Sequence, residues 1–100
     1  MKKIRLMLDS LGDPLFNESP DQIGAIDADD LPISSDLIRD IIHWDRVYQA
    51  GLAKDCSYFG FSDPKANNLL REAINLEGQC LFERLQEELR GKYEVEYTPF

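Results

Sequence analysis

DPKANNLLREAINLEGQCLFERLQEELRGKYEVEY, residues 63–97, decides the fold, because a long helical pattern runs directly into a strand pattern. Asp63 is a good N-cap, Pro64 suits the first helical position, and Gly91 is suited to end a helix. The apolar spacing between them predicts a helix over 64–90, roughly 40 Å long at 1.5 Å per residue. Gly78 lies in line with the apolar positions, which indicates close approach of the first helix or of another subunit.

Alternating apolar residues predict one strand near each end of the chain, over 3–8 (KIRLML) and over 93–97 (YEVEY). The polar faces of these two strands carry opposite charge. The charged positions are Lys3 and Arg5 in the first strand and Glu94 and Glu96 in the second. Opposite charges on neighbouring strands attract, so we expect the two strands to lie side by side in one sheet.

Residues 34–51 predict a first helix. Ser34 suits the N-cap, and Asp36 places a negative charge in the positive first turn. The apolar positions at helical spacing include Leu37, Ile41, Trp44 and Tyr48, and the polar side carries Arg39, Asp40, His43 and Arg46. This amphipathic pattern is typical of a helix packed on a core.

Two segments without clear periodicity connect these elements. Residues 9–33 are predicted to form an acidic loop, within which the pattern also allows a short strand over 23–27, and residues 52–62 an aromatic loop. The length of 100 residues fits one domain, 1–100. The predicted fold class is α/β of the α+β type: a small sheet containing the N- and C-terminal strands, packed on an antiparallel pair of helices. Two strands alone are marginal, so we expect either a third strand from the loop or pairing in a homodimer.

Negative charge is concentrated in one part of the chain. The formal net charge is −8, and residues 6–38 contain neither Lys nor Arg. The acidic residues there are Asp9, Asp13, Glu18, Asp21, Asp27, Asp29, Asp30 and Asp36. Such a field repels nucleic acid and anionic membrane, and it speeds encounter with a basic partner. An acidic loop kept for solubility explains the same charge equally well.

No segment has the length and hydrophobicity of a membrane helix, and the apolar start of the chain is too short for a signal peptide. We therefore expect a cytoplasmic protein that binds neither membrane nor nucleic acid directly. Cys56 and Cys80 fit two reduced, partly buried thiols better than one disulfide, although a disulfide stays open.

Motifs for catalysis or metal binding are missing from the sequence. A single histidine, His43, and two distant cysteines give no zinc spacing, and the acidic residues 27–30 lack the glycine and the closing glutamate of a calcium loop. His43 with Cys56 could form a thiol–base pair, but two such residues in 100 positions are expected by chance. We therefore predict no enzyme activity, no cofactor and no metal site.

Five short motifs spread over nearly the whole chain together resemble a group of small bacterial proteins. They are Asp30–Ser34 (DLPIS), the helix with Trp44 and Tyr48, and residues 60–64 (GFSDP), 77–81 (EGQCL) and 93–97 (YEVEY). The group comprises the immunity proteins of contact-dependent growth inhibition and related polymorphic toxin systems. The resemblance implies a cytoplasmic inhibitor that binds one cognate toxin domain, and many such toxins are nucleases with basic clefts.

The resemblance and the charge pattern together give a candidate contact face. Its acidic members are Asp27, Asp29, Asp30, Asp36 and Asp40. Trp44 is by default a core residue and becomes an anchor of this face if its ring is exposed. Three other functions stay open: a dimeric accessory protein, a DNA mimic that blocks a nucleic-acid-binding protein, and a small enzyme that uses His43 or Cys56.

Overall fold

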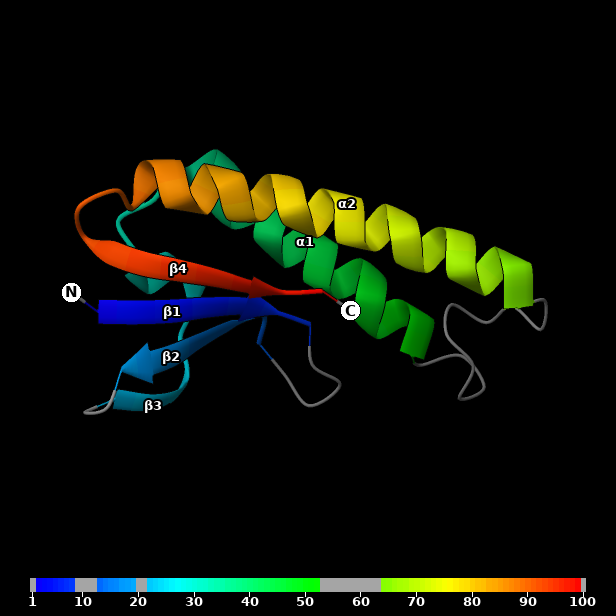
Figure 1. Cartoon of the computed structure of the whole chain (residues 1–100), viewed down its shortest axis with the longest axis horizontal. Helices are drawn as coiled ribbons and strands as arrows, with labels where there is room; N and C mark the ends of the chain where they lie inside the picture. Colours follow the sequence, from blue (N-terminus) through cyan, green and yellow to red (C-terminus); the bar gives the residue numbers. More distant parts are fainter. Residues whose placement is uncertain (1, 9–12, 20–21, 53–63, 100) are drawn as a thin grey trace.

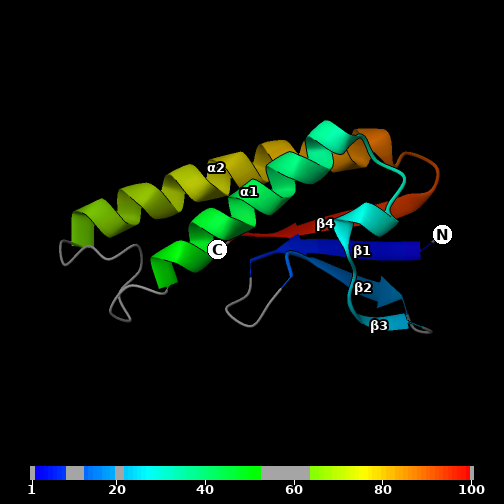
Figure 2. The ribbon, with the colours of Figure 1, turned by 180° about the vertical axis from the view of Figure 1, so that it is seen from behind.

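A computed structural model describes residues 2–8, 13–19, 22–52 and 64–99 of the chain. Within these residues the elements are β1 (Lys2–Met7), β2 (Leu15–Ser19), β3 (Gln22–Ala25), the 3₁₀ turn η1 (Ala28–Asp30), α1 (Ser35–Leu52), α2 (Pro64–Glu88) and β4 (Tyr93–Thr98). Both helices lie over the same face of one sheet, as Figures 1 and 2 show from opposite sides. The protein is therefore an α+β fold of two layers, as the sequence predicts.

The four strands form one sheet in the order β3-β2-β1-β4. β1 pairs with β2 in antiparallel register, with Leu6 opposite Leu15, and with β4 in parallel register, with Ile4 opposite Val95. These four side chains are buried between the sheet and the helices. The prediction that the terminal strands are neighbours is confirmed (Figure 1).

Ion pairs cover the face of the sheet that points away from the helices. The Lys3 ammonium lies 2.7 Å from the Glu96 carboxylate, and the Arg5 guanidinium lies 2.6 Å from Glu96 and 2.7 Å from Glu18. The hydrogen bond from Lys3 lowers the pKa of Glu96. The predicted cross-strand attraction thus exists, and it pairs Lys3 and Arg5 of β1 with carboxylates.

The two helices run antiparallel, and polar contacts fix their register near the start of α1 and the end of α2. Ser34 caps α1, because its Oγ accepts a hydrogen bond from the Leu37 amide at 3.2 Å. The same Oγ donates to Glu88, at the end of α2, at 2.9 Å. Further along, Arg84 of α2 binds Asp40 of α1 at 2.7 Å. The start of α1 therefore lies against the end of α2.

Gly78 marks the closest approach between α2 and its neighbours. A Cβ atom at this position would lie 2.7 Å from Cζ2 of Trp44 on α1, and it would also meet the Tyr97 hydroxyl on β4. The predicted close approach is confirmed, and the neighbours are α1 and the last strand. At the other predicted glycine, Gly91, φ is +79°, a left-handed conformation that ends the helix.

The sequence prediction is wrong for part of residues 9–33, which contain β2 and β3 rather than only a loop. Leu15 is buried against β1, so pairing with an existing strand stabilises a segment whose own composition favours turns. The allowed strand at 23–27 lies close to β3. The two extra strands supply the stability that a two-stranded sheet lacks.

The ends of both helices also differ slightly from the predictions. α1 extends to Leu52, and α2 ends at Glu88, followed by a turn in which the Tyr93 amide donates to the Leu89 carbonyl oxygen at 3.0 Å. The predicted aromatic loop lies outside the described residues from position 53 onward, as does Cys56. Cys80 is exposed on α2 rather than partly buried.

Candidate functional site

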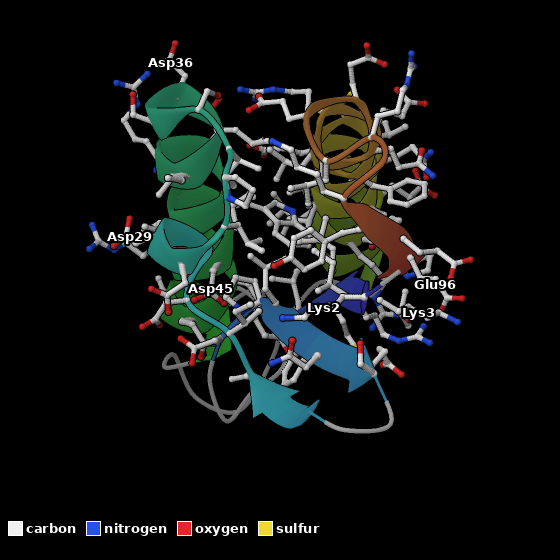
Figure 3. The ribbon with its side chains drawn as sticks, turned by 90° about the vertical axis from the view of Figure 1, so that its left-hand side faces the viewer. Lys2, Lys3, Asp29, Asp36, Asp45 and Glu96 are labelled. Atoms are coloured by element: carbon white, nitrogen blue, oxygen red, sulfur yellow. The ribbon has the colours of Figure 1, made fainter. Side chains whose placement is uncertain are left out.

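The three aspartates predicted at positions 27, 29 and 30 lie in and beside η1, and all are exposed. η1 packs against α1. Its short turn is closed by a hydrogen bond from the Asp30 amide to the Asp27 carbonyl oxygen at 3.0 Å. The backbone therefore holds these carboxylates beside α1, on the side of the molecule away from Lys3 and Glu96 (Figure 3).

A hollow of about 190 Å³ lies between η1, α1 and the segment before β2. We call it the acidic hollow; its lining residues are Asp13, Asp27, Asp29 and Asp45, together with Pro14, Ile26, Ala28, Ile42 and Arg46. None of its four aspartates forms an ion pair within the described part of the chain. Four aspartates and one arginine, Arg46, thus line this hollow, and no ion pair joins them within the described part of the chain.

Two members of the acidic hollow were missed as site residues from the sequence. Asp13 joins it because the Pro14 carbonyl oxygen accepts a hydrogen bond from the Met7 amide at 2.9 Å, which ties this segment to β1. Asp45 joins it from α1, three positions after Ile42, and helical spacing places such residues on one face. Periodicity could have indicated Asp45, whereas the place of Asp13 depends on the tertiary fold.

Asp36 and Asp40 lie elsewhere on α1. Arg84 of α2 binds Asp40 and its hydrogen bond lowers the pKa of that carboxyl, and Arg39 binds Asp36 at 3.1 Å. Neither aspartate lines the acidic hollow. The structure therefore divides the five predicted aspartates between η1 and a separate part of α1.

Trp44 cannot anchor an exposed contact face, because its side chain is only 1% exposed. Its indole Nε1 donates a hydrogen bond to the Ile74 carbonyl oxygen at 2.9 Å, and its ring lies 6.3 Å from that of Tyr97. The condition for Trp44 to act as an anchor, an exposed ring, is thus not met, and its default assignment to the core is right. The physical reason is that α2 covers the ring at Gly78.

A second hollow, of about 420 Å³, adjoins the first along the outer side of α1. We call it the α1 groove; its lining residues are Asp29, Ser35, Ile38, Arg39, Ile42, His43 and Arg46. Asp29, Ile42 and Arg46 line both hollows. The two hollows therefore form one continuous surface whose charge changes along its length.

A comparison with protein families matches residues 2–100 to the family described as Serratia CdiI immunity protein-like. The chain belongs to this family. A search of curated proteins finds no match. The family match confirms the resemblance seen in the sequence motifs. The acidic hollow therefore lies on a member of a family of immunity-like proteins.

The described part of this immunity-like chain contains neither a helix long and apolar enough to cross a membrane nor a group of three or more potential metal-ligating side chains. His43 is exposed on α1, and its possible partner Cys56 lies outside the described residues. The thiol–base pair therefore gains no support, and the expected lack of enzyme activity, cofactor and metal stays a prediction.

Asp45 is the carboxylate in the acidic hollow whose pKa is perturbed. Burial raises its pKa, the nearby Asp13 raises it further, and a hydrogen bond from Gln49 at 3.3 Å opposes the shift. The charged form is therefore disfavoured in the folded protein. A cation from a binding partner would relieve this penalty.

We expect Asp45→Asn to raise stability at pH 7 to 8. A carboxyl whose folded pKa exceeds its unfolded value of about 3.9 destabilises the native state above the folded pKa, and the penalty disappears as pH falls toward the unfolded value. The gain should be below about 1 kcal/mol, because the side chain is partly exposed. Thermal unfolding between pH 4 and 8 measures it, with the exposed Asp30→Asn as control. Equal gains for both variants at all pH values would contradict the assignment.

Proposed function

We propose that this chain neutralises a cognate toxin domain with nuclease activity by covering its basic cleft with the acidic hollow. The observation that carries the proposal is that Asp13, Asp27, Asp29 and Asp45 line one hollow and form no ion pair inside the described part of the chain. Membership of an immunity-protein family supports a toxin as the partner. On this proposal the chain acts in the cytoplasm and catalyses no reaction.

The charge of a nuclease cleft explains why such a surface inhibits. Nucleases bind phosphates with Lys and Arg side chains, and the binding releases counterions. Carboxylates held at one face replace the phosphates and are steered to the cleft over long range. Lys3 and Arg5 are ion-paired with Glu96 and Glu18 on the outer face of the sheet, whereas the aspartates in and beside η1 have no such partner among the described residues.

The remaining predicted contact residues extend this surface. Asp30 is exposed in η1 beside the acidic hollow. Asp36 and Asp40 have arginine partners at 3.1 Å and 2.7 Å, so a basic toxin residue competes with an existing ion pair there. We therefore propose that contact centres on η1 and that Asp36 and Asp40 contribute less.

Removing charge from the acidic hollow should weaken the complex with the cognate toxin. We expect the triple variant Asp13→Asn, Asp27→Asn, Asp29→Asn to bind about tenfold more weakly and to show a smaller loss of affinity on adding salt. Calorimetry with the purified toxin domain, encoded beside this chain, at two salt concentrations measures both. Asp45 is left intact because its replacement also changes stability.

A matched control removes three exposed charges from α2, with Glu72→Gln, Glu77→Gln and Glu83→Gln. This variant has the same net charge and should bind nearly as the wild type does. Equal loss in both variants would show that only net charge matters, and no loss in the first would remove the acidic hollow from the interface. Wild-type protein that binds a nucleic-acid-binding host protein and no toxin would instead favour the DNA-mimic function.

A further inference from the structure

The α1 groove differs from the rest of this acidic protein in the sign of its charge. Three basic side chains, Arg39, His43 and Arg46, line it, and Asp29 is its one acidic lining residue. The chain as a whole carries a net charge of −8. The basic side of α1 is therefore a local exception, directly beside the acidic hollow.

Arg46 has no structural use that the described residues reveal. Arg5, Arg84 and Arg90 each bind a carboxylate, and Arg39 binds Asp36. Arg46 lines both hollows, yet it makes no ion pair within 4.0 Å in the described part of the chain. An exposed guanidinium with five free donors is well suited to a carboxylate from outside.

The floor between these charges is apolar. Ile38 is partly buried and Ile42 is 36% exposed, whereas Leu37 and Ile41 of the same helix are fully buried. An aliphatic side chain that rests on Ile38 and Ile42 removes this surface from water. The groove therefore offers both an apolar contact and a directed anion contact.

We propose that the α1 groove receives a segment of the cognate toxin that carries a carboxylate beside an apolar side chain. Arg46 binds the carboxylate, Arg39 and His43 flank it, and the apolar side chain packs on Ile38 and Ile42. This inference rests on the proposed function and adds the chemistry of the partner. Continuity supports one occupant for both hollows, because Asp29, Ile42 and Arg46 belong to both.

The arrangement explains how a strongly acidic inhibitor selects one toxin. The acidic hollow attracts any basic cleft, whereas the α1 groove repels a basic segment and accepts an acidic one. Specificity arises from such a repulsive element as much as from attraction. On this inference, the cognate toxin has a basic region that faces the acidic hollow and, next to it, an acidic region that faces the α1 groove.

A charge reversal at Arg46 tests the inference. We expect Arg46→Glu to bind the purified cognate toxin domain at least about tenfold more weakly, because like charges then face each other. Lys92→Glu is the matched control, since Lys92 is exposed in the turn before β4 and makes no ion pair within the described residues. It should change the affinity less than about twofold. Circular dichroism checks that both variants are folded.

A second measurement identifies the partner group. Replacing each exposed Asp or Glu of the toxin by Lys should yield one variant that binds Arg46→Glu at least about tenfold more tightly than it binds the wild type.

Unchanged or tighter binding of wild-type toxin by Arg46→Glu would overturn the inference and leave the proposed function intact. A change of oligomeric state in Arg46→Glu alone, measured by analytical ultracentrifugation, would overturn it in favour of a second copy of the chain. Failure of the wild type to bind the toxin at all would instead count against the proposed function.

Discussion

Replacing Trp44 by alanine is expected to cost about 3–5 kcal/mol of folding stability, as is typical of buried aromatic residues. The ring is only 1% exposed, and it lies between α1, α2 and β4, where it contacts Tyr97 and donates a hydrogen bond to Ile74. Small domains are stable by roughly 5–15 kcal/mol, so this loss removes a large part of the total and lowers the urea concentration at the unfolding midpoint. Urea unfolding followed by circular dichroism measures it.

Trp44→Phe separates the two contributions of the indole. It keeps most of the apolar ring and loses the Nε1 donor, so we expect a smaller cost, about 1–3 kcal/mol. Toxin affinity should change only through the folded fraction in both variants. If Trp44→Ala unfolds at the wild-type urea concentration but loses toxin binding, Trp44 is a contact residue after all.

The helices and the terminal strands could be predicted because their signals are local. Ser34 caps α1, Gly91 ends α2 with a left-handed φ, and both act within one or two turns of the chain. The attraction between Arg5 and Glu96 was visible as opposite charge on two alternating segments. Each of these signals depends on neighbours in sequence or on a single pairing.

β2 and the acidic hollow could not be predicted, because each depends on contacts between distant segments. Leu15 is buried through its pairing with Leu6, and the turn-rich composition around it conceals that strand. Asp13 and Asp45 meet only after β2 is paired and η1 is packed on α1. Asp36 and Asp40 lie apart from the acidic hollow, since closeness in sequence to Asp29 and Asp30 does not place helix residues on the same face.

The sequence correctly predicts that Arg39, His43 and Arg46 lie on the polar side of α1. It does not predict the groove that these residues line. Helical spacing places the three on one side of α1, which the sequence indicates as solvent-exposed. The sequence cannot show that η1 borders this side and turns it into a groove beside four carboxylates. These three residues become a candidate interface only because the fold places η1 and the acidic hollow beside them.

Gly78→Ala is expected to destabilise the protein by about 1–3 kcal/mol, as overpacked core positions do. The direction of this stability change is informative, because alanine in place of glycine inside a helix otherwise stabilises a protein by about 1 kcal/mol. The added Cβ would lie 2.7 Å from Cζ2 of Trp44, a ring that is buried and hydrogen-bonded and so has no free space to move into. Thermal unfolding measures the loss, at roughly 4–8 °C per kcal/mol for a domain of this size.

Two further variants show whether close packing is the cause. Gln79→Ala changes the neighbouring exposed position of the same helix and should stay within about 0.5 kcal/mol of the wild type. Tyr97→Phe removes the hydroxyl that the new Cβ would meet, so in the Gly78→Ala background it should restore part of the loss, while the contact with Trp44 remains. In the wild-type background the same change loses the hydrogen bond to the Asn75 carbonyl oxygen at 3.2 Å, so it should destabilise. A Gly78→Ala protein more stable than the wild type would show that α2 does not approach α1 and β4 at this point.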